Sequence, residues 1–235
     1  MVFDTGGLNI KTGNWMSLMK KDMGGSAHVL GLAWMIMALE LPVNLKVLIS
    51  VAENSISDDS FRPGDIIKSR KGLNVEIKDT DAEGRLVVGD ALTRACEDAP
   101  DLLIDFCTLT GAARVALGYD IPAFFTNRDT SLMPSLIKSG MMSDDFVWAL
   151  PLHAPYDREM DSDIADVAND SSMGRAGAIQ AALFLQRFIE ADVDWIHFDC
   201  YAWEQYGKPG RPKGGADTGM RAMFHMLEER YGKAS

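Results

Sequence analysis

The stretch Asp79-Thr80-Asp81-Ala82-Glu83-Gly84-Arg85 sets two carboxylates and a guanidinium at alternate positions, just before the apolar run 86–88. If this stretch is extended, alternate side chains point to the same side, and Asp81, Glu83 and Arg85 converge on one spot. Two carboxylates packed together repel unless a cation or a shared proton offsets their charge, and hard divalent ions are the usual cations. The alternative is a solvated acidic turn, because Asp, Thr and Gly are ordinary turn residues.

Two further acidic residues near the start of the sequence favour the metal site over the turn. Asp4 stands where a strand-like segment runs into a glycine turn, Gly6-Gly7, and Asp22 precedes a long apolar helix. Acids at a strand end, before a helix and after a β-hairpin are typical of a metal site that distant segments assemble. The sequence therefore predicts a metal site built from these carboxylates.

Three blocks of the sequence resemble the signature blocks of the leucyl (cytosol) aminopeptidase family. They are Phe3–Lys11, Lys20–Gly25 and Thr80–Leu86, and the block Asp81-Ala82-Glu83-Gly84-Arg85 is highly specific. The similarity covers nearly the whole chain, and it continues through 62–65, 108–112, 174–175 and 177–179.

The resemblance implies a two-metal centre that holds Mn²⁺ or Zn²⁺. Asp4, Asp22, Asp81 and Glu83 match the family's carboxylate ligands, of which Asp4 and Glu83 correspond to the two that bridge both ions. Two cations about 3.5–4 Å apart lower the pKa of a shared water, so that hydroxide exists at neutral pH. The implied activity is the release of an N-terminal residue, leucine or another apolar residue, from peptides with a free α-amine.

Two basic residues match the family's catalytic groups. Lys11 resembles the lysine that polarises the scissile carbonyl and stabilises the oxyanion, and Arg85 resembles the arginine that holds a bicarbonate acting as a general base. Without the motif, Lys11 reads as a solvated side chain after a glycine turn. Arg85 is equally readable as a structural partner of Asp81 or Glu83.

The pocket for the substrate's first side chain is expected at Met19 and at the turn that contains Thr108, Leu109 and Gly111. A flexible thioether in an apolar wall suits leucine and methionine side chains, although an ordinary core role for Met19 is nearly as plausible. Tyr201 stands where many family members have a small residue, so that it narrows the pocket and weakens the expectation of leucine preference.

The composition of the chain excludes several classes of partner. It has 235 residues, with 23 Lys and Arg against 34 Asp and Glu, which gives a net charge of −11. No run of Lys and Arg is long enough to bind the phosphate backbone of a nucleic acid, so nucleic-acid binding is not expected. The apolar stretch from Ala27 to Leu39 is too short to span a bilayer, so no membrane partner is expected either.

The cysteines and the start of the sequence indicate a reducing compartment. Cys96, Cys107 and Cys200 are odd in number and widely spaced, and they read as buried thiols of a cytoplasmic protein. We expect no signal peptide, because Asp4 comes before any apolar stretch.

Periodicity and turn residues predict alternating strands and helices. We expect strands at 44–51, 65–68, 74–78, 102–107, 121–126 and 193–198, and helices at 27–39, 84–96, 131–142, 177–189 and 218–231. The first of these strands, from Asn44 to Val51, is apolar throughout and is expected to be a buried central strand. This order predicts an α/β fold, a three-layer sandwich in which helices flank a mixed, largely buried central sheet.

The chain also departs from the family pattern. The family's metal-ligating lysine, five residues before the residue that matches Asp4, would fall ahead of Met1, and the family's N-terminal domain has no counterpart. We therefore expect residues 1–235 to be a single, partial catalytic domain. An inactive fragment or non-catalytic subunit that retains the fold is the main alternative to an active enzyme. A homohexamer is expected by resemblance alone.

A third function, a dimetal phosphoesterase, follows from the carboxylate pairs but not from the rest of the sequence. Carboxylate pairs also serve phosphate chemistry. The four histidines, His28, His153, His197 and His225, have no ligand spacing, and no phosphate-cradling loop is recognisable. This alternative is therefore the weakest of the three.

Overall fold

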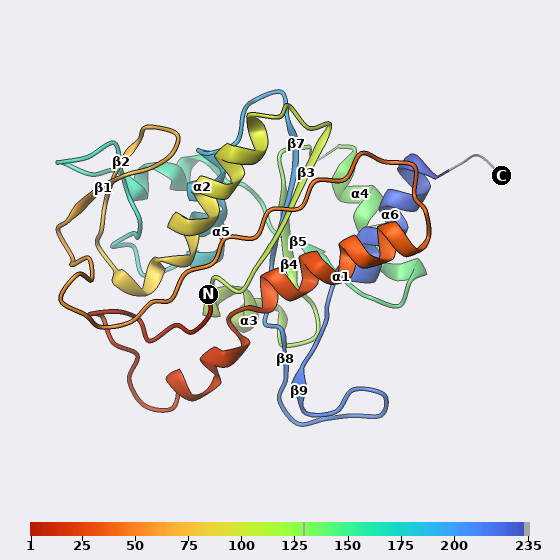
Figure 1. Ribbon diagram of the computed structural model, residues 1–235, viewed down its shortest axis with the longest axis horizontal. Coiled ribbons are helices and arrows are strands. Elements are labelled where there is room, and N and C mark those ends of the chain that lie inside the picture. The colour runs from red at the N-terminus through yellow and green to blue at the C-terminus, as the bar shows by residue number, and fades with distance from the viewer. Residues whose placement is uncertain (129, 233–235) are drawn as a thin grey trace.

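The computed structural model describes residues 1–128 and 130–232 (Figure 1). The helices are α1 (Gly24–Ala38), α2 (Gly84–Cys96), α3 (Gly111–Leu117), α4 (Leu132–Met142), α5 (Gly177–Gln186) and α6 (Met220–Tyr231). Three 3₁₀ helices are η1 (Met16–Lys21), η2 (Thr80–Ala82) and η3 (Ala154–Met160). The strands are β1 (Ile66–Lys68), β2 (Asn74–Glu76), β3 (Leu102–Cys107), β4 (Ala123–Thr126), β5 (Trp148–Ala149), β6 (Val167–Ala168), β7 (Asp194–Asp199), β8 (Trp203–Glu204) and β9 (Gly214–Gly215).

The central sheet has the strand order β3-β7-β4-β5 and is mixed. β3 runs parallel to β7, whereas β4 is antiparallel to β7 and parallel to β5. Figure 1 shows this sheet nearly edge-on, with α1, α4 and α6 on one face and α2 and α5 on the other. The expected α/β sandwich with a mixed central sheet is confirmed. A smaller sheet, β1-β2-β6, and the hairpin β8-β9 lie outside it.

Alternating side chains of β7 pack into two hydrophobic clusters, one on each face of the sheet. On β7, Ile196 and Phe198 pack with α1, α4 and α6, whereas Trp195 packs with α2 and α5. This alternation is the ordinary consequence of the two-residue period of a strand, and both faces of the strand are apolar because both are covered by helices. The sheet is therefore buried on both faces, and its strand ends are left to carry polar residues.

A glycine lets α1 lie directly on β3. A Cβ atom at Gly25 would stand 2.1 Å from the carbonyl oxygen of Phe106, so only glycine allows this approach. Asp22 lies two residues before α1, and Thr108 immediately follows β3, so the contact also brings these two residues together. The close packing of one helix on one strand thus sets the position of a predicted site residue.

Most of the predicted elements form within a few residues of their expected bounds. The expected helix at 84–96 and strand at 102–107 coincide with α2 and β3, and the expected hairpin is formed by β1 and β2. The expected thiols Cys96, Cys107 and Cys200 are free and buried. In the described part of the chain, no helix is both long enough and apolar enough to cross a bilayer.

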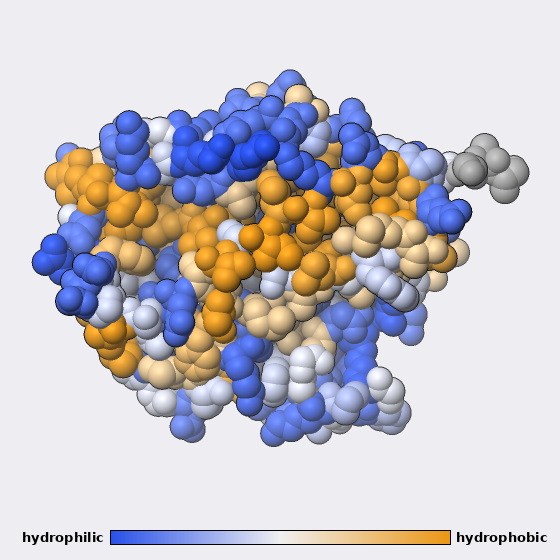
Figure 2. Space-filling view, in the orientation of Figure 1, coloured by the Kyte–Doolittle hydropathy of each residue, from blue (hydrophilic) through white to orange (hydrophobic). Residues whose placement is uncertain are grey.

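The expectation of a buried central strand at 44–51 is wrong. This segment is extended but belongs to no strand, and Leu45, Val47, Ile49 and Val51 are exposed. A strand needs the backbone of a neighbour, and here pairing begins only beyond the segment, where Asn54 forms a parallel bridge with Asp4. Figure 2 shows a band of apolar side chains crossing the face where this segment lies in Figure 1.

Candidate metal centre

Three of the four predicted carboxylate ligands converge. Oxygen atoms of Asp4, Asp81 and Glu83 all lie within 4.8 Å of one another. Asp4 and Glu83 are each only 4% exposed and are withdrawn from water, whereas the Asp81 side chain is 33% exposed. The ligand atoms of this acidic cluster are all oxygens, which is the donor set that hard divalent cations prefer.

The acidic run 79–85 is not extended. The backbone conformation from which we expected alternate side chains to converge is therefore wrong. Thr80–Ala82 is a 3₁₀ turn, and Glu83 is already in the right-handed helical region at the start of α2. The Asp79 carboxylate accepts a hydrogen bond from the Asp81 N–H at 2.9 Å and thereby caps this turn. The turn, rather than a strand, directs Asp81 and Glu83 to the same place.

Asn54 is a residue of the site that the sequence analysis missed. Its side-chain amide donates to Asp4 Oδ1 at 2.9 Å and to Glu83 Oε2 at 3.0 Å, and it also lies 3.0 Å from the Thr80 carbonyl oxygen. The signal in the sequence was a polar residue shortly after an apolar run, because the end of such a run is where sites form in α/β sheets.

Lys11 is the cation that contacts the cluster. Its ammonium group lies 2.7 Å from Asp4 Oδ2 and also donates a hydrogen bond to Asp81. Burial alone lowers the pKa of Lys11, but the hydrogen bonds with Asp4 and Asp81 outweigh burial and hold its pKa above the ordinary value. The reading of Lys11 as a solvated side chain is therefore wrong.

The charge of the cluster exceeds what Lys11 offsets. Burial, together with the neighbouring Asp4, raises the pKa of Glu83 to about 8, and burial raises the pKa of Asp81 to about 6. Carboxyl groups with such raised pKa values lack a sufficient positive partner. An oxygen-only cluster with excess negative charge, two of whose three carboxylates are buried, fits one or more divalent cations.

Asp22, the fourth predicted ligand, lies beside the cluster but outside its closest group. Its carboxylate accepts a hydrogen bond from the Thr108 hydroxyl at 2.7 Å, and Lys21 Nζ lies 4.0 Å away. Burial raises the pKa of Asp22, and the charge of Asp4 raises it further. Asp22 is thus near enough to the other carboxylates for their charges to interact.

Arg85 does not converge with Asp81 and Glu83. It lies in the first turn of α2, where its guanidinium donates to the Asn169 carbonyl oxygen at 2.7 Å and lies 3.9 Å from Asp170. The reading of Arg85 as the structural partner of Asp81 or Glu83 is therefore wrong. Burial lowers the pKa of Arg85, although nearby acidic residues counter this effect.

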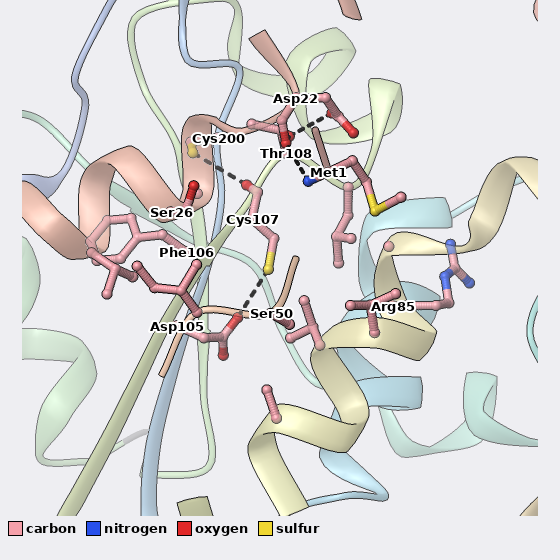
Figure 3. Close-up of a pocket in the computed structure, with 18 of the residues that line it drawn as sticks. Met1, Asp22, Ser26, Ser50, Arg85, Asp105, Phe106, Cys107, Thr108 and Cys200 are labelled. Atoms are coloured by element: carbon pink, nitrogen blue, oxygen red, sulfur yellow. Dashed lines mark hydrogen bonds between the residues drawn. The ribbon is translucent and has the colours of Figure 1, made fainter. Parts of the chain in front are cut away.

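A cavity of about 800 Å³ opens beside the carboxylates, and all the predicted pocket residues line it. These are Met19, Thr108, Leu109 and Gly111, and the same cavity is lined by Tyr201. Figure 3 shows the hydrogen bond between Thr108 and Asp22 at the top of the view and Arg85 at its right. Met19 is only partly buried, so it is not an ordinary core residue.

Asp199 holds the pocket turn in place and was also missed by the sequence analysis. Its carboxylate accepts the N–H groups of Leu109 and Thr110 at 3.1 and 3.2 Å. Thr110 in turn caps α3 by accepting from the Ala113 N–H. Asp199 ends β7 directly beside the end of β3, which is the kind of position that no local sequence pattern discloses.

Comparison with known proteins places this geometry in a family. Residues 1–224 match the cytosol aminopeptidase family, catalytic domain. Among curated proteins, the chain is 45% identical to a probable cytosol aminopeptidase of Syntrophotalea carbinolica and 44% identical to one of Chlamydia abortus. These matches cover 97% and 99% of this chain but 46% and 47% of the relatives, so the chain spans about half of their length.

Two solved structures share the fold. The crystal structure of cytosol aminopeptidase from Coxiella burnetii superimposes with a TM-score of 0.95 at 53% identity, over 98% of this chain and 50% of that chain. The bottromycin maturation enzyme BotP, in complex with Mn, superimposes with a TM-score of 0.87 at 36% identity, over 98% of this chain and 51% of that chain. The chain therefore belongs to the cytosol aminopeptidase family, whose catalytic-domain model its residues 1–224 match.

Proposed function

We propose that this chain is the catalytic part of a metal-dependent aminopeptidase that removes the N-terminal residue, leucine or another apolar residue, from peptides. The convergence of Asp4, Asp81 and Glu83 with Lys11 at one end of the cavity is the observation that carries this proposal. Its membership in the cytosol aminopeptidase family supports the same reaction.

In this proposal, Asp4, Asp22, Asp81 and Glu83 hold two divalent cations, Mn²⁺ or Zn²⁺. When bound, the cations supply Lewis-acid activation of water and a positive anchor for the free α-amine of the peptide. Asn54 keeps Asp4 and Glu83 in position through its amide hydrogen bonds, and Thr108 does the same for Asp22. The preformed hydrogen bonds lower the cost of ordering these carboxylates around a cation.

Lys11 and Arg85 are assigned the two catalytic roles. The Lys11 ammonium, held between Asp4 and Asp81, stabilises negative charge that develops on the scissile carbonyl oxygen. Arg85, a buried residue that lines the cavity, would hold a bicarbonate, which would supply a general base. Met19, Thr108, Leu109 and Gly111 receive the first side chain of the substrate.

The first test is hydrolysis of leucine p-nitroanilide with added Mn²⁺, by the wild-type chain and by Glu83→Gln. The proposal expects turnover by the wild type and its loss in Glu83→Gln, because the neutral amide removes one charge from the cluster. Glu228→Gln changes an exposed residue of α6 and is the matched control, with unchanged activity expected. N-acetyl-leucine p-nitroanilide should not be cleaved, because its amine is blocked. Turnover that survives Glu83→Gln would contradict the proposal.

The second candidate is a chain that keeps the fold and binds metal without catalysis. One contact favours it: Lys11 already forms ion pairs with Asp4 and Asp81 and competes with a cation for them. Titration calorimetry with Mn²⁺ separates the two. Binding without turnover supports the non-catalytic chain, and binding with turnover supports the enzyme.

Within the described residues, no histidine joins the carboxylate cluster, which leaves the phosphoesterase alternative without support.

The proposal also covers the substrates, the cellular location and the oligomeric state of the enzyme. Its substrates are peptides with a free N-terminus, and its location is the cytoplasm, as the family's name and the three free thiols suggest. A homohexamer remains a prediction, which light scattering of the purified chain would test. The net charge of −11 argues against nucleic-acid partners.

A further inference from the structure

One wall of the pocket for the substrate's first side chain carries an arginine that the proposed function does not use. Arg114 lies on α3 and lines the same cavity as Met19, Thr108, Leu109 and Gly111. A Cβ atom at Gly111 would stand 3.5 Å from the Arg114 Nη2 atom. The guanidinium therefore borders the turn that is expected to receive the first side chain.

Two aromatic rings hold this guanidinium in place. The Arg114 Cζ atom lies 5.2 Å from the centroid of the Trp15 ring and 4.9 Å from that of the Tyr201 ring. Tyr201 is itself packed against Tyr119, with 4.9 Å between the two ring centroids. A guanidinium that stacks on aromatic rings uses its flat face, so the N–H groups at its edge stay available to an acceptor.

The positive charge of this wall lacks an acidic partner. In the part of the chain that the structure describes, no Asp or Glu forms an ion pair with Arg114, whereas Arg128, for example, pairs with an aspartate. Lys21 is a second cation, with its Nζ atom 5.0 Å from the centroid of the Tyr201 ring, and it has Asp22 at 4.0 Å. Among the described residues, Arg114 is thus the cation of this wall that is left for an anion from outside.

The chemistry of the arginine indicates which anion fits. The planar fork of a guanidinium binds a carboxylate through two parallel hydrogen bonds. The carboxyl carbon of glutamate is its δ carbon, which stands at the same position along the side chain as the methyl carbons of leucine. A pocket that takes leucine therefore also has room for glutamate, whose methylene groups would contact the apolar side chains of Met19 and Leu109.

We propose that Arg114, ordered by Trp15 and Tyr201, binds the side-chain carboxylate of an N-terminal glutamate, so that peptides with this first residue join the apolar ones as substrates. The inference rests on the proposed function, because it assigns a ligand to the same pocket. It also gives Tyr201 a second effect: the ring narrows the pocket and orients the arginine at its wall.

The probes are the α-aminophosphonic acid analogues of glutamate and glutamine, in which a phosphonate replaces the α-carboxyl group and which no peptidase hydrolyses. Their side chains have the same shape and differ in charge. Titration calorimetry in saturating Mn²⁺ should show that the wild type binds the glutamate analogue at least about tenfold more tightly than the glutamine analogue. Equal affinities, or binding of neither analogue, would overturn the proposal.

A variant of the arginine localises the preference. Arg114→Met keeps an unbranched apolar stem and removes the guanidinium, so the ratio of the two affinities should fall to about one. Arg158→Met is the matched control, because it removes the same charge from a side chain that is 79% exposed and does not line the cavity. It should keep the wild-type ratio.

If Arg114→Met does not fold, Arg114→Gln takes its place. A preference for glutamate that survives the loss of the guanidinium would show that another group, such as Lys21, binds the carboxylate. That result would overturn the role given to Arg114.

Hydrolysis separates this inference from the proposed function. The p-nitroanilides of glutamate and glutamine should differ mainly in KM, because the ion pair forms as soon as the substrate is bound, and Arg114→Met should remove the difference. A preference in binding without turnover of any p-nitroanilide would contradict the proposed function and leave the carboxylate site standing. Turnover of leucine p-nitroanilide with equal KM values for the other two would do the reverse.

Discussion

At the scale of single residues, the acidic site depends on a neutral side chain. Asn54 is 5% exposed, and its amide reaches three groups from two separate segments: Asp4, and Glu83 with the Thr80 carbonyl oxygen. An amide has two N–H groups, so one of these contacts is shared. Removing the amide would leave buried acceptors without donors.

We predict that Asn54→Ala lowers the free energy of unfolding by about 1–3 kcal/mol, because buried acceptors lose their hydrogen bonds. The same change should weaken Mn²⁺ binding by about 10–100-fold, the usual effect of losing a group that orients metal ligands. Urea denaturation and titration calorimetry measure the two effects. Asn14→Ala, at an exposed position, is the control. Wild-type affinity in Asn54→Ala would contradict the role given to Asn54.

A second buried pair makes stability depend on pH. His197 Nδ1 lies 2.6 Å from Asp105 Oδ1, and both residues face the α2 and α5 side of the sheet. Burial lowers the pKa of His197, but the charge and hydrogen bond of Asp105 outweigh burial, so the pKa lies above its ordinary value of 6.5. The stabilisation is complete below pH 6.5 and is lost as the pH rises through the raised pKa.

We therefore predict that wild-type protein loses more stability than His197→Gln when the pH is raised from 6 toward 9. Glutamine keeps a donor for Asp105 but does not titrate in this range. The measurement is the free energy of unfolding by urea at several pH values for both proteins, of which only the difference is interpreted. A constant difference over this range would show that His197 does not change its charge on unfolding.

At the scale of elements, the contact of α1 with β3 positions Asp22 beside Thr108. This contact depends on Gly25, where a Cβ atom would stand 2.1 Å from the Phe106 carbonyl oxygen. The obstacle is a backbone carbonyl group, which cannot rotate out of the way as a flexible side chain can. The helix would have to move away from the strand to accommodate even a methyl group.

We predict that Gly25→Ala lowers the free energy of unfolding by about 3 kcal/mol, despite the better helix propensity of alanine. Gly31→Ala in the same helix is the matched control, because its Cβ would meet only the flexible Met220 side chain. The control should stay within about 1 kcal/mol of wild type. Urea denaturation of both variants measures the free energies of unfolding. Equal losses in the two variants would contradict the role given to the close packing of α1 on β3.

At the scale of the whole molecule, the edge of the central sheet is the least supported region. Segment 44–51 is extended, exposes four large apolar side chains and lies along the open edge of the cavity. Its backbone is shaped for a sheet but lies outside the sheet's ladder, so local opening there costs little.

We predict that thermolysin cleaves the native chain first within 44–51, because extended, unpaired backbone with exposed apolar side chains suits a protease. β3 carries similar residues but is paired with β7 and should remain intact at the same protease concentration. Mass spectrometry of the early fragments identifies the sites. First cleavage in β3 would show that the sheet edge itself, rather than this segment, is the weak point.

Local signals predicted much of the fold. α2 and β3 form with the expected bounds, because helical spacing after Gly84 and an apolar run bounded by polar residues are complete within their own segments. The same signals failed at 44–51, whose apolar run is equally strong. The difference is that a helix satisfies its own backbone, whereas a strand depends on a neighbour that the segment itself cannot supply.

The sequence by itself determined which side chains carry the chemistry: the motif residues Asp4, Lys11, Asp81 and Glu83 were all recognisable, and they meet in the structure. Only the tertiary structure decided that a 3₁₀ turn aims Asp81 and Glu83 together, that Arg85 turns toward Asn169, and that Asn54 joins the segments. The physical reason is that a motif records residue types at fixed spacing. The direction of each side chain depends on backbone angles and on partners that lie far away in the chain.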